Sequence, residues 1–271
     1  MPLPAPGCTP AVDLAGRTVL VTGASGGLGR ALALAFAAQG ATVVLHGRVV
    51  RRLEALYDEI MAAGAPEPTI LPLDLAAAGP DEVGQAVGAL RAQLGRLDAL
   101  VHVAAMLGSL GPVEHQSFDA WLKVLRVNLA APMLLTRTLL PLLCEAPDAA
   151  VVFTLDHRAR DPRAYWGAYG ASKAGLTALA ATLADESDQR ANLRINAVIP
   201  GPIRSPLRML THPGEDKSAL PLPDALVPLY LYLVAGQSKA DSGRAYDGSA
   251  WLAGRPAETA LVAAAFLPPR P

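Results

Sequence analysis

The sequence predicts a single α/β domain built on a doubly wound parallel sheet of about seven strands, flanked by helices. Two observations predict this fold. Short apolar runs rich in Val, Ile and Leu alternate with Ala/Leu-rich stretches along most of the 271 residues. The apolar runs show no alternation with polar residues, which is typical of parallel strands covered on both faces. Right-handed crossovers then place about seven strands in the order 3-2-1-4-5-6-7.

The first part of the chain consists of three predicted strand–helix pairs. RTVLVT, ATVVLH and TILPL are β-branched or apolar runs of strand length. The segments that follow them are rich in helix-forming residues, and the first ends at Gly40, a residue favoured at helix ends. We therefore expect strands at 17–22, 41–46 and 69–73, and helices at 29–40, 50–63 and 81–94.

The second part continues the alternation with LDALVHV, AAVVFTL and LRINAVI, which predict strands at 97–103, 149–155 and 193–199. A long helix is expected from about 117 to 130, with a break or kink near Pro132 before it resumes to 143. A further helix is expected at 165–187. The chain then predicts a helix near 223–235 and a short strand at 243–247.

Three segments have distinct expected roles. Residues 1–13 are rich in proline and predict a flexible N-terminal arm, residues 14–250 form the domain, and residues 251–271 form a tail that packs on or extends it. The Pro-rich segment 200–223 follows the carboxyl end of a predicted strand, where ligands bind in such sheets. A substrate lid and a plain surface loop are both compatible with it.

Composition excludes several classes of function. The net charge is −1, which argues against nucleic acid as a partner. Cys8 and Cys144 lack metal-ligand spacing and are interpreted as reduced thiols. The N-terminal residues lack a basic start and an apolar core, and LLTRTLLPLLC is interrupted by Arg137 and Pro141. We therefore expect a cytoplasmic protein with no metal site and no membrane segment.

A glycine-rich turn, TGASGGLG, joins the first predicted strand to the first predicted helix. Gly23 permits the tight turn, Gly27 lets backbone amides approach a pyrophosphate, and Gly29 lets the helix lie close to the sheet. In this position the motif predicts a dinucleotide site, the alternative being a tight turn that binds nothing.

The end of the second strand indicates which dinucleotide is bound. The segment LHGRVVRR carries Arg48 and has no acid before Glu54. A carboxylate at this point holds the ribose 2′-hydroxyl of NAD, whereas a guanidinium can hold a 2′-phosphate. NADP(H) is therefore favoured over NAD(H). Arg51 and Arg52 are interpreted as a solvated helix start.

TGASGGLG followed by YGASK makes residues 14–250 resemble the short-chain dehydrogenase/reductase family, whose fold is of the Rossmann type. WGAYGASK, LADE and VPLYLYL are similar to its YciK-like bacterial branch. The resemblance implies an acid beside the adenine at Asp74 and a Pro-Gly turn beside the nicotinamide at 200–201. It also implies a homodimer or homotetramer that pairs through the helices at 117–143 and 165–187, although the apolar surfaces of these helices could equally face only the sheet. The full implied set of cofactor contacts is Gly23, Ser25, Gly27, Leu28, Gly29, Arg48, Asp74, Leu75, Ala104, Ala105, Tyr169, Lys173, Pro200, Gly201 and Ile203.

The catalytic residues implied by the resemblance are Tyr169, Lys173 and Asn128. Tyr169 and Lys173 lie at i and i+4 of a predicted helix and therefore face the same cleft. An ammonium beside a phenol lowers the phenol's pKa, so that Tyr169 could donate a proton to a carbonyl oxygen as hydride arrives. Lys173 would also bond the nicotinamide ribose, and Asn128 would support a water chain. The expected substrate is a small carbonyl or alcohol compound.

Two departures from the family pattern bear on activity. Asp156 stands at the position of the serine that polarises the substrate carbonyl. Val103 and Ala105 replace the asparagine and the glycine of the family's Asn-Ala-Gly segment.

An ionised Asp156 that lies ~4 Å from the developing oxyanion would repel it by about 4 kcal/mol at an effective dielectric of about 20. This repulsion would slow the reaction on the order of a thousandfold. Three arrangements avoid this loss. Asp156 could be protonated, His157 or Arg158 could neutralise it, or Thr154 could supply the hydroxyl. Alternatively, Asp156 forms salt bridges only within the loop 156–163 and points away from the site.

Three hypotheses remain. The chain is an NADP(H)-dependent oxidoreductase with a modified site, or a catalytically impaired binding protein with regulatory or assembly roles. The third hypothesis is catalysis without net redox, with Asp156 as general base. Arg158, Arg160 and Arg163 could draw an acidic substrate or simply form a solvated loop.

Overall fold

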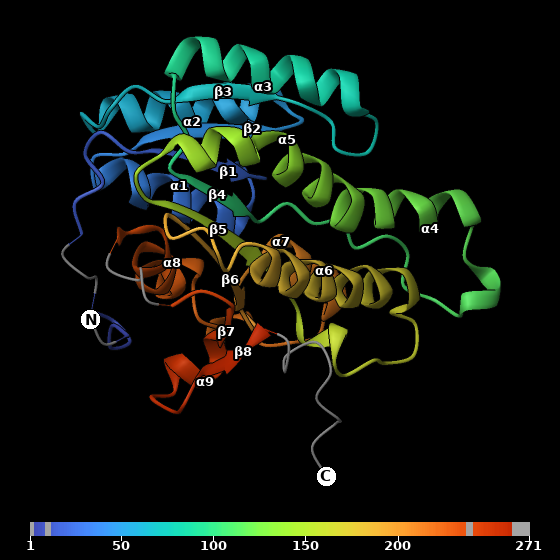
Figure 1. Cartoon of the computed structure of the whole chain (residues 1–271). Helices are drawn as coiled ribbons and strands as arrows, with labels where there is room; N and C mark the ends of the chain where they lie inside the picture. Colours follow the sequence, from blue (N-terminus) through green and yellow to red (C-terminus); the bar gives the residue numbers. More distant parts are fainter. Residues whose placement is uncertain (1–2, 9–11, 237–240, 262–271) are drawn as a thin grey trace.

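The computed structural model describes residues 3–8, 12–236 and 241–261 of the chain. Its centre is one sheet in the order β3-β2-β1-β4-β5-β6-β7-β8 (Figure 1). The first seven strands are parallel and confirm the predicted order. Their bounds lie close to the predicted ones: β1 Thr18–Thr22, β2 Thr42–Gly47, β3 Thr69–Pro72, β4 Ala99–His102, β5 Ala149–Thr154, β6 Leu193–Ile199 and β7 Arg244–Asp247.

An eighth strand, β8 (Glu258–Ala260), pairs antiparallel with β7 and was not expected. It follows a short helix, α9 (Gly248–Leu252), so the first part of the tail extends the sheet. Residues 262–271 lie outside the described part. At the other end of the chain, the indole Nε1–H of Trp251 donates to the Pro4 carbonyl at 2.7 Å, which anchors the described part of the arm.

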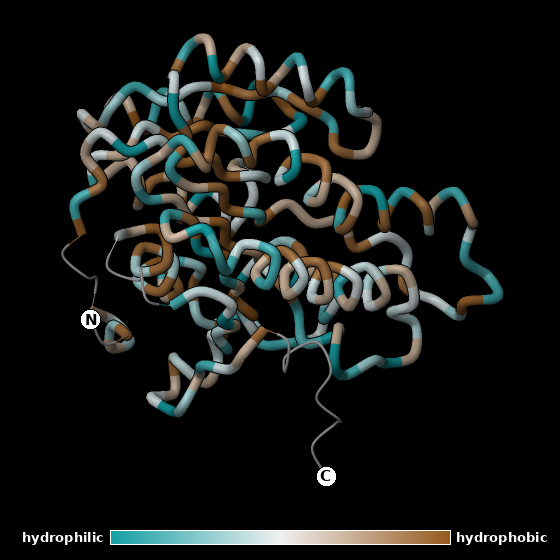
Figure 2. The backbone as a smooth tube through the Cα atoms, viewed as in Figure 1, coloured by the Kyte–Doolittle hydropathy of each residue, from teal (hydrophilic) through white to brown (hydrophobic). Residues whose placement is uncertain are grey.

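Helices cover both faces of the sheet (Figure 1). One core cluster joins the sheet to α1 (Gly27–Ala38), α2 (Val50–Ala62) and α8 (Val227–Val234). A second cluster on the other face joins it to α3 (Pro80–Leu94), α5 (Ala131–Glu145) and α6 (Gly167–Glu186). The hydrophobic segments concentrate on the strands and on the helix faces turned toward them (Figure 2). Burial of this apolar surface on both faces stabilises the fold.

Of the break or kink expected near Pro132, the break is wrong. Helix α4 (Phe118–Leu125) passes through a π turn at Arg126–Ala130 into α5 without interruption. In the π turn, the Ala131 N–H donates to the Arg126 carbonyl, five residues back, so the helix is already widened where Pro132 lacks a donor. The run Phe118–Glu145 is long and apolar enough to cross a membrane by length and composition, but half of its apolar stretch is buried inside the fold.

The Pro-rich segment after β6 contains helix α7 (Pro206–Thr211), which was not expected. It begins at Ser205, whose hydroxyl accepts from the Arg208 N–H at 3.2 Å. A serine followed by proline is a normal helix start, but six residues are too few to show a period.

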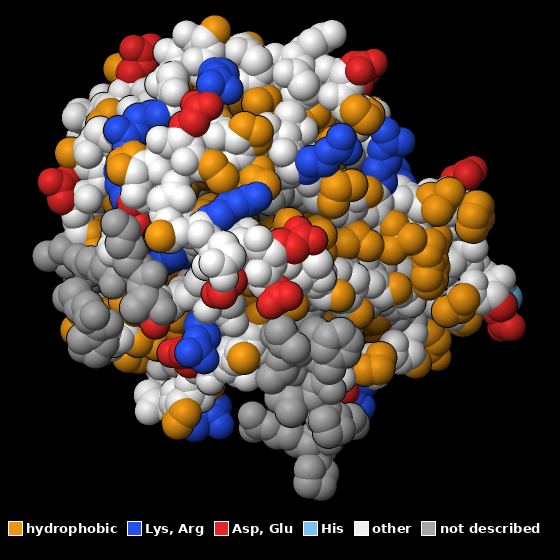
Figure 3. Space-filling view, in the orientation of Figure 1, with side chains coloured by type: hydrophobic (Ala, Val, Ile, Leu, Met, Phe, Trp, Pro, Cys, Tyr) orange, Lys and Arg blue, Asp and Glu red, His pale blue; other side chains and the backbone are white. Residues whose placement is uncertain are grey.

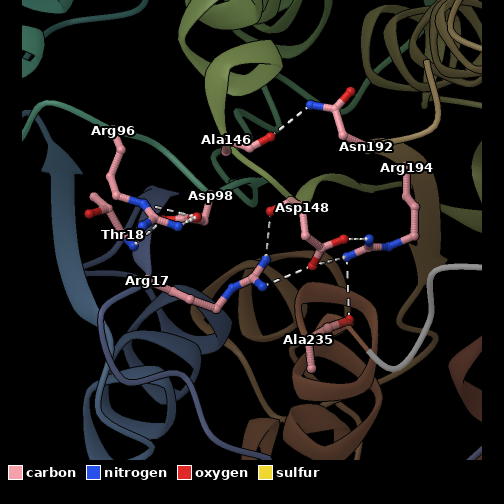
Figure 4. Close-up of polar contacts among 9 residues, drawn as sticks. All are labelled: Arg17, Thr18, Arg96, Asp98, Ala146, Asp148, Asn192, Arg194 and Ala235. Carbon is pink, nitrogen blue, oxygen red and sulfur yellow. Dashed lines mark hydrogen bonds and ion pairs between the residues drawn. The ribbon is translucent and has the colours of Figure 1, made fainter.

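Ion pairs hold the amino ends of the strands together, at the edge of the sheet remote from the cavity described below (Figure 4). The Asp148 carboxylate accepts from Arg17 at 2.8 Å and also from Arg194. The Arg194 guanidinium in turn donates to the Ala235 carbonyl at 3.3 Å, at the end of α8. This cluster therefore links the starts of β1, β5 and β6.

Candidate active site

A cavity of about 620 Å³ opens at the carboxyl ends of the parallel strands. It is lined by nearly all of the residues that the sequence singled out: Gly23, Ser25, Gly27, Leu28, Gly29, Arg48, Asp74, Leu75, Ala104, Ala105, Asp156, Tyr169, Lys173, Pro200, Gly201 and Ile203. Asn128 is not among them, because it is fully buried behind the cavity wall. The folded chain therefore collects segments spread over about 180 residues at one edge of the sheet, as parallel strands require.

The glycine turn has the shape of a phosphate cradle. Gly23 has a φ of +67°, and a Cβ added there would lie 3.0 Å from the Ala104 Cα. A Cβ added at Gly29 would overlap the Gly23 carbonyl oxygen. Helix α1 begins at Gly27 with no side-chain cap and no acid in its first turn. Its first amides and its dipole are therefore available to an anion in the cavity, which fits the pyrophosphate of a dinucleotide.

A buried histidine at the end of β2 supports this turn. His46 Nδ1 accepts from the Gly23 N–H at 3.3 Å, and the ring lines the cavity. Burial lowers the pKa of His46 to about 4, so the imidazole is neutral and can accept this bond. His46 was not predictable from the sequence, since a lone histidine in an apolar strand carries no functional signal.

Cationic side chains stand where a 2′-phosphate would be recognised. Arg48 is exposed and lines the cavity, as the cofactor interpretation expects. Arg52 is exposed in the first turn of α2, as expected of a solvated helix start, and it also lines the cavity. Within the described ranges neither guanidinium has an ion-pair partner.

Asn128 links the β4–α4 loop to the helix that carries Tyr169. Its side-chain oxygen accepts from the Met106 N–H at 2.7 Å, and its amide donates to the Met106 carbonyl at 2.8 Å and to Ser172 Oγ at 2.9 Å. Ser172 Oγ donates to the Tyr169 carbonyl at 2.7 Å. Asn128 lies in the π turn of the long helix, a feature frequent at functional sites. The role of Asn128 in supporting a water chain stays a prediction.

Tyr169 faces Asp156. The phenol donates to Asp156 Oδ2 at 3.0 Å, while Asp156 Oδ1 accepts from the Arg158 backbone N–H at 2.8 Å. The carboxylate thus lines the cavity and does not point away into the loop. Tyr169 is only 3% exposed. Burial, followed by the charge and hydrogen bond of Asp156, raises the pKa of Tyr169 well above its ordinary value.

Lys173 is held beneath this pair. Its ammonium donates to the Thr154 carbonyl at 2.9 Å and lies 5.8 Å from the centre of the Tyr169 ring. Burial lowers the pKa of Lys173 to about 8, and the nearby Asp156 charge opposes this shift. The net pKa shift of Tyr169 is upward, through burial first and Asp156 second, and not downward as expected from a neighbouring ammonium.

The groups considered as compensation for Asp156 have other partners. His157 Nε2 lies 3.8 Å from Asp247. The Arg158 guanidinium lies 3.2 Å from Asp161 and stacks 4.9 Å from the centre of the Trp166 ring. The Thr154 hydroxyl is 2.9 Å from the Tyr230 hydroxyl. Tyr169 is therefore the group that engages the Asp156 carboxylate inside the cavity.

The second departure has a structural replacement. The Thr22 hydroxyl accepts from the Val103 and Ala104 N–H groups at 3.0 and 3.1 Å, and lies 3.4 Å from the Val101 carbonyl. It ties β1 to β4 at the point where the family pattern has asparagine. Val103 and Ala105 line the cavity.

Comparisons with known proteins agree with this geometry. Residues 17–216 match the family described as short chain dehydrogenase. The uncharacterised oxidoreductase YciK of Escherichia coli K12 is 37% identical over 231 residues, which covers 85% of this chain and 91% of that protein. A structure from Shigella flexneri 2a, solved with NADP, has a TM-score of 0.85 and 36% identity, covering 89% of this chain and all of that one.

A structure from Escherichia coli CFT073, solved with NADPH, has a TM-score of 0.85 and 36% identity over 88% of this chain and 99% of that one. The match over residues 17–216 agrees with the fold, the glycine turn and the Tyr169–Lys173 pair. The chain belongs to the short chain dehydrogenase family.

Proposed function

We propose that this protein is an NADP(H)-dependent oxidoreductase that interconverts a small alcohol and its carbonyl compound. The observation that carries the proposal is that a glycine cradle, the Tyr169–Lys173 pair and Arg48 line one cavity, and that Arg48 has no ion-pair partner among the described residues. The NADP and NADPH found in two similar structures support the choice of cofactor. When bound, the nicotinamide would supply or accept the hydride.

The residues of this chain would divide the remaining work. The first turn of α1 would hold the pyrophosphate, Arg48 and Arg52 the 2′-phosphate, and Asp74 the adenine. Lys173, positioned by its bond to the Thr154 carbonyl, would reach the nicotinamide ribose.

Substrate would enter beside α7, where Leu207 and Leu210 line the cavity. These apolar side chains would exclude water from the reacting oxygen and favour a substrate with an apolar body.

The second candidate function is a nucleotide-binding protein without turnover. The Tyr169–Asp156 hydrogen bond favours it, because it occupies the phenol and raises its pKa. NADPH consumption with a panel of ketones and quinones separates the two functions, with Tyr169→Phe as control. The oxidoreductase proposal requires turnover that the control reduces by about 100-fold or more. Binding of NADPH without turnover of any panel member would favour the second candidate.

We also propose that two copies pair through the face formed by α4 and α6. Apolar side chains gather across these helices (Figure 3), and Phe118, Val113 and Leu122 are 73%, 65% and 45% exposed. An exposed apolar surface of this kind commonly marks a protein interface. The cytoplasmic location expected from the sequence stays a prediction.

A further inference from the structure

Two acidic groups, a phenol and a carboxyl, share one hydrogen bond at the reacting end of the cavity. Tyr169 is the donor and Asp156 Oδ2 the acceptor, 3.0 Å apart, so one proton lies between the two groups. An ordinary aspartic acid loses its proton about six pH units before an ordinary tyrosine. When the pair holds a single proton, that proton is therefore on Tyr169 and the negative charge is on Asp156.

The surrounding charges maintain this arrangement. On the helix side, the Lys173 ammonium donates to the Thr154 carbonyl and lies 5.8 Å from the phenol ring, so it is not hydrogen-bonded to the phenol oxygen. On the loop side, the Arg158 backbone N–H holds Asp156 Oδ1, while its guanidinium lies beside Asp161. In the same loop, His157 Nε2 lies 3.8 Å from Asp247 Oδ2. Burial and Asp156 together raise the pKa of Tyr169.

We propose that in this protein Asp156 is the catalytic acid–base that exchanges the proton with the substrate oxygen, while Tyr169 remains a neutral hydrogen-bond donor to that oxygen. The inference rests on the proposed oxidoreductase function. In the family pattern the tyrosine exchanges the proton with the substrate and the serine donates a hydrogen bond to the substrate oxygen. The proposal gives the first role to Asp156 and the second to Tyr169. Both side chains line the cavity, so a substrate oxygen beside the pair can contact both once the phenol O–H turns from Asp156 Oδ2 to that oxygen.

The proton and electrons balance as follows in the oxidative direction. The alcohol's hydroxyl proton passes to Asp156 Oδ2, its carbinol hydrogen leaves with an electron pair to the oxidised dinucleotide, and the carbon–oxygen double bond forms. The alcohol is oxidised, the dinucleotide is reduced, and the proton on Asp156 then leaves to solvent. Reduction runs through the same steps in reverse.

This exchange removes the electrostatic conflict that an ionised aspartate would create. An aspartate that stayed ionised would repel the developing oxyanion by about 4 kcal/mol at ~4 Å and an effective dielectric of about 20. Once Asp156 has accepted the proton it is neutral, and it donates a hydrogen bond to the same oxygen. The Tyr169 phenol supplies the second donor, as a serine hydroxyl would.

A titration that needs no substrate tests the protonation states. The absorbance of tyrosinate is followed against pH for the wild type and for Tyr169→Phe, and the difference isolates Tyr169 from the other five of the six tyrosines. We expect Tyr169 to stay a phenol through neutral and mildly alkaline pH. In Asp156→Ser its ionisation should move to lower pH, because the carboxylate that opposes it is gone. A phenolate at neutral pH in the wild type overturns the proposal.

The pH dependence of turnover tests the roles, with 1-phenylethanol and NADP⁺ as probes. Wild-type oxidation should fall at acid pH as Asp156 becomes protonated. Asp156→Asn should lose this dependence and about 100-fold or more in rate, whereas Tyr169→Phe should be slower but keep the wild-type dependence. If Asp156→Asn keeps the acid limb, or Tyr169→Phe removes it, the proposal is wrong.

Failure of the proposed function would look different. It would appear as a lack of NADPH binding or of any turnover by the wild type. In that case the tyrosinate titration still decides whether the proton of the pair lies on Tyr169. A folded state of each variant is checked by its unfolding temperature before either experiment.

Discussion

Replacing Asp148 by Asn should destabilise the protein by about 3 kcal/mol. Asp148 Oδ2 lies 2.8 Å from Arg17, a gross attraction of roughly 6 kcal/mol at an effective dielectric of about 20 before desolvation is subtracted. Its other oxygen contacts Arg194, whose side chain is 2% exposed. The asparagine amide keeps the shape of the Asp148 carboxyl but removes the negative charge that compensates Arg17 and Arg194. Breaking a buried ion pair in this way costs about 3–5 kcal/mol of stability.

Urea unfolding followed by circular dichroism measures this loss. For a domain of this size, about 3 kcal/mol corresponds to a fall of roughly 6–12 °C in Tm. Glu145→Gln is the matched control, because Glu145 pairs with Arg91 on the surface, with both side chains about half exposed. The control should change the unfolding free energy by about 1 kcal/mol or less. Equal effects of the two substitutions would show that the Asp148 charge does not stabilise the fold through Arg17 and Arg194.

The pH dependence of unfolding gives a second readout for Asp148. Burial alone would raise its pKa, but the hydrogen bonds and charges of Arg194 and Arg17 outweigh burial and lower it. A carboxyl with a lowered folded-state pKa contributes stability above its unfolded pKa of about 4. That stability is lost as the pH falls through the folded value. The difference in stability between wild type and Asp148→Asn should therefore shrink in acid.

Three further predictions concern the cofactor site and the apolar face. Arg48→Ala should weaken NADPH binding by about 10- to 100-fold and leave NADH binding little changed. Arg51 lies outside the cavity lining, so Arg51→Ala should alter the binding of neither dinucleotide. An equal loss for both dinucleotides in Arg48→Ala would contradict a 2′-phosphate contact. Gly29→Val should abolish NADPH binding in titrations, since a side chain there meets the Gly23 carbonyl, whereas Gly84→Ala meets nothing within 4 Å and serves as control. Phe118→Glu should convert a dimer to a monomer by light scattering, and an unchanged mass would exclude the α4–α6 face as the interface.

The sheet could be predicted from the sequence because each parallel strand is apolar along its whole length and is followed by a helix. The β7–β8 pair was missed, since three residues of ETA carry no strand pattern of their own. The sequence left both a break and a kink open at Pro132, because proline lacks the backbone N–H that a helix needs. Whether a π turn accommodates that loss depends on packing, which the local sequence does not encode.

The cavity lining was largely predictable because its residues occupy motif positions at strand ends. The direction of the Asp156 carboxylate was not. A strand end fixes where the backbone lies, but the choice between the loop and Tyr169 depends on the Arg158 N–H and the buried phenol, which meet only in the folded chain. The upward pKa shift of Tyr169 follows from burial first and from this contact second, and both depend on the folded chain.

A fluorescence titration of NADPH with the wild-type protein shows whether the cavity at the carboxyl ends of the strands is a dinucleotide site. We expect the NADPH emission to change and to saturate on addition of protein, with Gly29→Val giving no change. If the emission stays constant with folded wild-type protein, or if Gly29→Val responds equally, the cavity is not the dinucleotide site.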